Sequence, residues 1–188
     1  MTQDTNAQFD AALALCRDIF AKKLRDYGAS WRIMRPEAVT DQIFIKAKRI
    51  RSLEVKRVSA VGEGILPEFE AIVNYGIIGI IQLRQGFVDS KDLTPEQALA
   101  AYDSVAADAR RLMIAKNHDY DEAWRGMRVP SYTDLILMKI ERVKEIEDHA
   151  GQTIVSEGID ANYMDMINYA VFGIIKLTEA NDGDSTAL

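Results

Sequence analysis

The chain repeats itself, and this repeat constrains the fold more than any other feature of the sequence. Residues 23–50 align without a gap to residues 116–143, at a constant offset of 93 positions. Twelve pairs are identical: Lys23/Lys116, Asp26/Asp119, Tyr27/Tyr120, Trp31/Trp124, Arg32/Arg125, Met34/Met127, Arg35/Arg128, Thr40/Thr133, Asp41/Asp134, Ile43/Ile136, Lys46/Lys139 and Arg49/Arg142. Such a repeat predicts a fold built from two copies of one supersecondary unit.

The alignment continues downstream at an offset of 94, after one inserted residue. The further matches are Glu63/Glu157, Gly64/Gly158, Ile65/Ile159, Asn74/Asn168, Tyr75/Tyr169, Gly79/Gly173, Ile80/Ile174 and Ile81/Ile175. We therefore expect a first unit over residues 1–86 and a second over residues 94–180, within one compact domain. Residues 87–93 form the expected linker, and residues 181–188 an expected disordered tail.

Each unit is predicted to contain three helices. The first helices span residues 8–26 and 95–118, and the second of these opens with a capping box at Thr94 and Gln97 around Pro95. Thr40 and Thr133 are expected to be the N-caps of the second helices.

The third helices begin near Glu63 and Glu157 and are apolar on nearly every face, which is typical of buried central helices. Gly79 and Gly173 fall inside them, where glycine costs about 1 kcal/mol relative to alanine. A close crossing of the two third helices would compensate for this cost. The predicted fold is therefore an all-α, internally duplicated helical bundle, with two three-helix units related by a pseudo-twofold axis.

Composition limits the classes of partner. The 188 residues carry a net charge of −6, which argues against binding to a nucleic-acid backbone. Cys16 is the single cysteine, so no intrachain disulfide can form, and a cytoplasmic location is expected. The apolar stretches 72–83 and 166–177 are too short to cross a membrane. A homodimer remains open.

The segment between the first and second helices carries aromatic and basic residues in both units. Tyr27 and Trp31, like Tyr120 and Trp124, offer flat surfaces for a base. Arg35 and Arg128 offer guanidinium groups that pair with phosphate oxygens. Alternatively, the rings close the end of the bundle and the arginines tie loops to helix carbonyls.

Charged residues recur on the second helices. Asp134, Lys139 and Arg142 repeat Asp41, Lys46 and Arg49, and each set lies within a limited arc of its helix. The cations are candidate phosphate ligands together with Lys23 and Lys116, and Asp134 is a candidate catalytic acid. The same charges could form a salt-bridged helix face. Asn74 and Asn168, within apolar third helices, are candidates to bind a base or a neighbouring helix.

Glu157 and Asp165 are the best candidates for catalytic acids and for ligands of Mg²⁺, which prefers carboxylate and phosphate oxygens. The first unit has Ala71 at the position of Asp165, with Glu70 one position away. The two copies have therefore diverged, and the second keeps the fuller acidic set. Surface or capping acids are the alternative interpretation.

The motif residues resemble those of the nucleotide-modification-associated domain family. The second unit carries the pattern as Lys116, Asp119, Tyr120, Asp134, Lys139, Arg142, Glu157, Ile159, Asp165, Asn168 and Tyr169. Two tandem copies would cover nearly the whole chain, and the resemblance implies a role in nucleotide metabolism.

A looser similarity extends to the all-helical nucleoside triphosphate pyrophosphohydrolases of the MazG-like and dimeric dUTPase-like types. Those enzymes hold Mg²⁺ with an E-x-x-E motif on one helix and E-x-x-D on the next. This chain departs from both motifs, because its second helix lacks E-x-x-E and its third helix has Asp165 and Asn168 in place of E-x-x-D.

Two hypotheses follow. In the first, the protein binds a small-molecule nucleotide and cleaves a triphosphate with Mg²⁺. In the second, it is a non-catalytic helical nucleotide sensor or an interaction scaffold, whose duplicated charges form structural ion pairs.

Overall fold

The computed structural model describes residues 4–56 and 64–185, with side chains described to residue 180. Within these residues the secondary structure is entirely helical. The elements are α1 (Thr5–Tyr27), η1 (Ser30–Ile33), α2 (Pro36–Lys56), α3 (Leu66–Gln85), α4 (Pro95–Tyr120), η2 (Ala123–Gly126), α5 (Val129–Asp148) and α6 (Ile159–Ser185). The expected two sets of three helices are confirmed, and each set also has a short 3₁₀ helix between its first and second α-helices.

Helix boundaries follow local sequence signals at several ends. The capping box at the start of α4 is confirmed, because Thr94 accepts a hydrogen bond from the Gln97 backbone and the Gln97 side chain accepts one from Thr94. Gly151, which follows the end of α5, has a φ of 79° that suits glycine. Glu63 and Gly62 lie outside the described residues.

Thr40 and Thr133 are not N-caps, contrary to the prediction. Both are fully buried inside their helices, one turn after the true starts at Pro36 and Val129. Prolines at or next to these starts explain the earlier beginning, because proline suits the first helical turn. The two threonines instead form hydrogen bonds between α2 and α5.

The end of the chain also differs from the prediction. Helix α6 continues to Ser185, whereas a tail was expected from Asn181. Across the described residues, every helix falls short of the length and apolar character that a membrane crossing requires.

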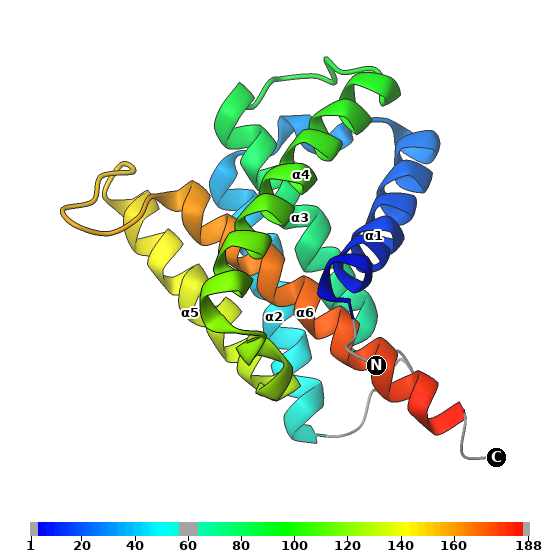
Figure 1. The fold of residues 1–188 in the computed structure, drawn as a ribbon. Coiled ribbons are helices and arrows are strands. Elements are labelled where there is room, and N and C mark those ends of the chain that lie inside the picture. Colours follow the sequence, from blue (N-terminus) through cyan, green and yellow to red (C-terminus); the bar gives the residue numbers. More distant parts are fainter. Residues whose placement is uncertain (1–3, 57–63, 186–188) are drawn as a thin grey trace.

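The helices form three layers, with α3 and α6 in the middle, α1 and α4 on one side, and α2 and α5 on the other (Figure 1). Equivalent helices of the two units therefore pair within each layer. Most of the large apolar side chains of α3 and α6 are buried, as expected for central helices that are apolar on nearly every face.

The central crossing confirms the interpretation of the two helical glycines. A Cβ atom added to Gly79 of α3 would overlap the ring of Tyr163 on α6. A Cβ atom added to Gly173 of α6 would lie 3.0 Å from the ring of Phe69 on α3. Phe69 and Tyr163 are equivalent positions of the two units, so the two contacts are related by the pseudo-twofold axis.

Reciprocal contacts extend this symmetry to the outer layers. Between α1 and α4, Arg17 binds Asp103 and Arg110 binds Asp10, both at 2.6 Å. Arg110 is the repeat equivalent of Arg17, and Asp103 is the repeat equivalent of Asp10. The same contact therefore occurs twice, as it would between the two subunits of a twofold dimer.

The pairs between α2 and α5 obey the same rule. Thr40 donates to Glu147 at 2.6 Å, and Thr133 donates to Glu54 at 2.9 Å. The ion pairs Lys144–Asp41 and Arg51–Asp134 follow, at 3.2 and 3.0 Å. One chain thus contains an interface of the kind expected in a homodimer of single units, and a homodimer of the whole chain stays a prediction.

The glycine crossing gives a first test. Gly79→Ala should lower the free energy of unfolding by about 3 kcal/mol, because the methyl group overlaps Tyr163 within a packed core. Gly173→Ala should cost less, since Phe69 needs to move only slightly. Chemical denaturation should show Gly126→Ala, where nothing lies within 4 Å of the added atom, to be nearly neutral. Equal stability of all three variants would contradict the close crossing.

Candidate functional site

Each unit contains a pocket at the same place, between the end of its first helix, its 3₁₀ helix and its third helix. The second-unit pocket has a volume of about 230 Å³, and the first-unit pocket about 470 Å³. Their equivalent lining residues are Lys23/Lys116, Tyr27/Tyr120, Trp31/Trp124, Asn74/Asn168 and Tyr75/Tyr169. The structure thus brings most of the predicted aromatic and amide residues of each unit to one hollow.

The spacing of residues on α6 explains how the second-unit pocket is built. Asp165, Asn168, Tyr169 and Phe172 line it and follow the spacing i, i+3, i+4, i+7, which places them on one face of a helix. The end of α4 supplies Lys116 and Tyr120, and η2 supplies Trp124. The wall is therefore aromatic, with a polar group at only a few points.

Asp165 is held by two lysines. Its side chain is 8% exposed, and its two oxygens lie 2.5 Å from Lys116 Nζ and 2.7 Å from Lys139 Nζ. Lys139 is buried as deeply as Asp165, whereas the Lys116 side chain is 44% exposed at the pocket mouth. The cluster carries one net positive charge and faces the pocket through Lys116 and Asp165.

Electrostatic effects link this cluster to neighbouring charged residues. Partial burial alone would lower the pKa of Lys116, but the hydrogen bond to Asp165 and its charge outweigh burial and raise it, with a smaller contribution from Glu157. Lys116 is therefore protonated at neutral pH. Burial, followed by the charge of Asp165, raises the pKa of Tyr169, and Lys116 opposes this rise, with a smaller opposing contribution from Arg142. Glu157 and Arg142 do not line this pocket.

In the first unit the buried acid is Glu68, which lies one helical turn before Ala71, the equivalent of Asp165. Glu68 is buried, and it pairs with Arg49 and, at 3.3 Å, with Lys46. The counterpart of Glu68 in the second unit is Asn162, whose amide donates instead to the carbonyl of Gly158 at 2.8 Å. Lys46 and Arg49 are thus bound to a buried carboxylate and do not line the first-unit pocket.

Arg142, the counterpart of Arg49, is left without an acid by this exchange. It is exposed and forms no ion pair with any residue that the structure describes. It lies on α5 one turn beyond Lys139 and lines an open hollow beside the α5–α6 loop, together with Glu157. The second unit therefore has an exposed guanidinium group at this position, where the first unit has one paired with Glu68.

The two equivalent asparagines differ in hydrogen bonding. Both amide atoms of Asn74 are hydrogen-bonded, because Nδ2 donates to the carbonyl of Cys16 at 3.1 Å and Oδ1 accepts from the hydroxyl of Tyr102 at 2.8 Å. Asn168 is 6% exposed, yet neither atom of its amide bonds another group among the described residues. Phe9 on α1 stands where Tyr102 stands on α4, so a hydroxyl donor is missing beside Asn168.

The two tryptophans also differ. Trp124 stacks on Phe172 with ring centroids 4.4 Å apart, and the guanidinium of Arg125 lies 4.4 Å from its ring centroid. Its faces are thus largely covered, and its buried Nε1 has no hydrogen-bond partner among the described residues. Trp31 has Ile78 in place of Phe172, and its nearest ring is tilted Phe20 at 6.1 Å.

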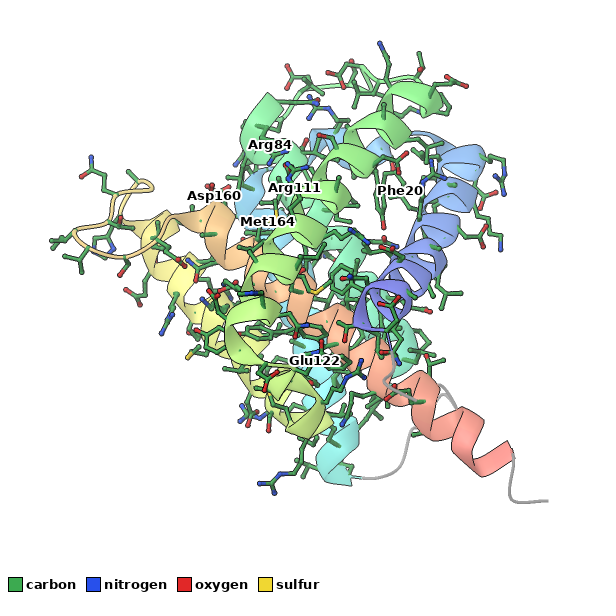
Figure 2. All side chains as sticks on the ribbon, in the orientation of Figure 1. Phe20, Arg84, Arg111, Glu122, Asp160 and Met164 are labelled. Atoms are coloured by element: carbon green, nitrogen blue, oxygen red, sulfur yellow. The ribbon has the colours of Figure 1, made fainter. Side chains whose placement is uncertain are left out.

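Figure 2 shows where two of the neighbouring side chains project. Phe20 lies between α1 and α4, with its ring 4.5 Å from that of Tyr102. Glu122 lies at the end of α4 and binds Thr5, Asn117 and Arg125. Phe20 lines the first-unit pocket, and Asn117, which Glu122 binds, lines the second-unit pocket.

Several predicted site residues lie outside both pockets. Asp134 pairs with Arg51 across the α2–α5 layer. Arg128 is exposed immediately before α5, and Arg35 lies 6.0 Å from the ring of Phe87. Lys116, Arg128, Lys139 and Arg142 therefore do not form one cluster, because only Lys116 and Lys139 meet at Asp165.

The described residues do not fit a resident magnesium ion. No group of three or more His, Cys, Asp or Glu side chains within residues 4–56 and 64–180 is placed to hold a metal. Both oxygens of Asp165 already bind lysines, and Glu157 precedes α6 in an exposed loop, so the expected helical spacing of these two acids does not apply.

The sequence matches one described family, twice. Residues 23–83 and 116–177 match the family described as nucleotide modification associated domain 1. The chain belongs to this family. The two matched segments coincide with the two structural units, from the end of the first helix to the third helix. No curated protein and no solved structure matches the chain, and the similarity to MazG-like enzymes stays a prediction.

Two residues that distinguish the two nucleotide modification associated domains, Glu68 and Tyr102, were not identified from the sequence. Glu68 replaces Asp165 as the buried acid of the first unit, rather than Glu70. Tyr102 supplies the hydroxyl that Phe9 cannot. Extending the repeat alignment over the first helices and over position 162 would have shown both exchanges.

The asparagine contrast predicts opposite effects of one substitution. Asn74→Leu should lower the free energy of unfolding by about 2 kcal/mol, because it leaves the buried Tyr102 hydroxyl without a partner and removes the bond to the Cys16 carbonyl. Asn168→Leu should raise it by about 1 kcal/mol, because it removes a buried amide that has no partner. Urea denaturation of the free protein measures both. Equal losses would show that Asn168 is hydrogen-bonded within the protein.

The contacts of Asp165 with two lysines predict that removing this acid lowers the stability of the protein. Asp165→Asn should lower the free energy of unfolding by about 3 kcal/mol, because Lys139 stays buried without a counter-charge. The double variant Asp165→Leu/Lys139→Met should recover most of this loss. A stable Asp165→Asn single variant, measured by the same denaturation, would contradict the buried pair.

Proposed function

We infer that the protein binds a nucleotide in the second-unit pocket, with the base inside and the phosphate at the mouth. The observation that carries this proposal is the buried amide of Asn168, which has no partner among the described residues at the wall of an aromatic hollow. Buried polar groups in folded proteins are nearly always hydrogen-bonded, so a ligand that pairs with this amide would remove a cost that the free protein carries.

An amide side chain suits the edge of a nucleobase. It presents one acceptor and one donor side by side, which is how asparagine pairs with bases. Tyr120 and Tyr169 line the pocket and can cover the flat faces of a ring, whereas Trp124 presents its edge because its faces are already occupied.

The size of the pocket favours a base over a whole nucleotide. Pockets that enclose complete small-molecule ligands measure about 300–1,000 Å³, and this one measures about 230 Å³. Sugar and phosphate would therefore remain outside. The available cations on that side are Lys116, half exposed at the mouth, and Arg142, whose charge reaches Tyr169. Both can stabilise phosphate oxygens.

Binding, rather than hydrolysis, is the function that this geometry supports best. Asp165 is the single acid among the described lining residues, and both of its oxygens already bind lysines, so neither is placed to activate a water molecule. A non-catalytic nucleotide-binding protein is thus favoured over a pyrophosphohydrolase. The scaffold hypothesis retains the ion pairs between α1 and α4 and between α2 and α5, which are structural, but it gives no role to Asn168.

The two tryptophans make the proposal directly testable, because each pocket contains one of them. In a Trp31→Phe variant, the remaining emission comes from Trp124 in the second-unit pocket. Nucleoside monophosphates and triphosphates, and the matching nucleosides, should be titrated with and without Mg²⁺ while Trp124 fluorescence is followed. At least one base series is expected to change this emission and to raise the melting temperature.

Two substitutions separate recognition of the base from recognition of phosphate. Asn168→Leu should abolish binding of nucleotide and nucleoside alike. Arg142→Gln should weaken nucleotide binding about tenfold and leave nucleoside binding unchanged, because one charge-assisted hydrogen bond is lost. If no nucleotide alters Trp124 emission or the melting temperature, or if Asn168→Leu binds as tightly as the parent, the proposal fails and the scaffold hypothesis gains support.

A further inference from the structure

The first-unit pocket has the same framework as the second-unit pocket but different chemistry. It is about twice as large, at 470 Å³ against 230 Å³. Smaller residues account for the difference, since Ala71 and Ile78 stand where Asp165 and Phe172 stand in the second unit. A volume of this size lies within the range of pockets that enclose complete small molecules.

The charges around this pocket do not suit a phosphate. Lys46 and Arg49 are held by buried Glu68 and do not line it. The charged residues among the described lining are Lys23 and Glu70, which cancel. A phosphate-bearing ligand would therefore gain little from this lining.

Glu70 places a carboxylate, a hydrogen-bond acceptor, in the wall of the first-unit pocket. Its side chain is partly buried and forms no hydrogen bond or ion pair within the described part of the chain. Burial raises its pKa, as expected for a carboxyl group that no cation neutralises. The counterpart of Glu70 is Met164, an apolar residue on α6 labelled in Figure 2, so this acid belongs to the first unit alone.

The indole of Trp31 adds a second feature of a binding site. Trp31 is only 7% exposed, and its buried Nε1 has no hydrogen-bond partner among the described residues. Its nearest ring is tilted and 6.1 Å away, so the indole is not stacked as Trp124 is. Both amide atoms of Asn74 already bond protein groups, Cys16 and Tyr102, unlike those of Asn168.

We propose that the first-unit pocket is a second ligand site, which binds an amino-substituted heteroaromatic ring without phosphate, of the class of an aminated nucleoside. The ring lies against Trp31, and its exocyclic amino group donates to the carboxylate of Glu70. Carboxylates accept hydrogen bonds from the amino groups of bases in this way. The second unit then binds a phosphorylated ligand, and the first unit binds an uncharged one.

The test uses the full chain with Trp124→Phe, so that emission reports on Trp31 alone. Adenosine and cytidine should change this emission and bind at least tenfold more tightly than inosine and uridine, in which oxo groups replace the amino groups. Adenosine monophosphate should bind no more tightly than adenosine. Equal binding of the amino and oxo partners, or no change in emission with any of the four nucleosides at millimolar concentration, would overturn the proposal.

Variants of the two units distinguish this site from the nucleotide site. In the same background, Glu70→Gln should remove the preference for amino over oxo rings, and Ala71→Leu should block binding of all four nucleosides by filling the pocket. Asn168→Leu, which changes the other unit, should leave Trp31 titrations unchanged. A Glu70→Gln variant that keeps the preference, or an Asn168→Leu variant that loses it, would contradict a separate first-unit site whether or not nucleotides bind the second.

Discussion

The crossing of α3 over α6 is the contact on which the rest of the structure depends. Gly79 and Gly173 allow each central helix to pack against an aromatic ring of the other, Tyr163 in one direction and Phe69 in the other. This close approach places the two units in a twofold relation, and the reciprocal pairs in the outer layers follow from it. It also fixes the faces of α3 and α6 that line the two pockets.

Within this symmetric framework, the two pockets have diverged through a few exchanges at equivalent positions. Tyr102 and Phe9 decide whether an asparagine is saturated, and the exchange of Glu68 for Asn162 decides whether an arginine is neutralised. Duplication provided two copies of one hollow, and loss of an internal partner in one copy leaves groups available to a ligand. These four residues are buried and do not line either pocket, so each exchange acts through the neighbouring residue whose partner it supplies or removes.

Much of the fold could be predicted from the sequence, because repeats and helical periodicity are local patterns. The duplication, the six helices and the close glycine crossing were all predictable from residues such as Gly79 and Gly173. The starts of α2 and α5 were not, because threonine in the first turn resembles an N-cap when its partner on another helix is unknown. Partners such as Glu147 for Thr40 lie far away in the sequence.

The candidate site was predictable in part, for a related reason. The aromatic residues and Asn168 were identified correctly as neighbours, since the repeat marks them in both units. The pairing of Asp134 with Arg51, and of Asp165 with two lysines, depends on side-chain packing that a sequence pattern does not encode.

Asn168 and Asn74, though equivalent in the repeat, have different hydrogen-bonding states. Nuclear magnetic resonance of the side-chain amide groups in ¹⁵N-labelled protein tests this most directly. On addition of the nucleoside monophosphates, the Asn168 amide signals should shift and exchange more slowly with water, while those of Asn74 stay unchanged. Protected Asn168 signals in the free protein that no nucleotide moves would contradict the account.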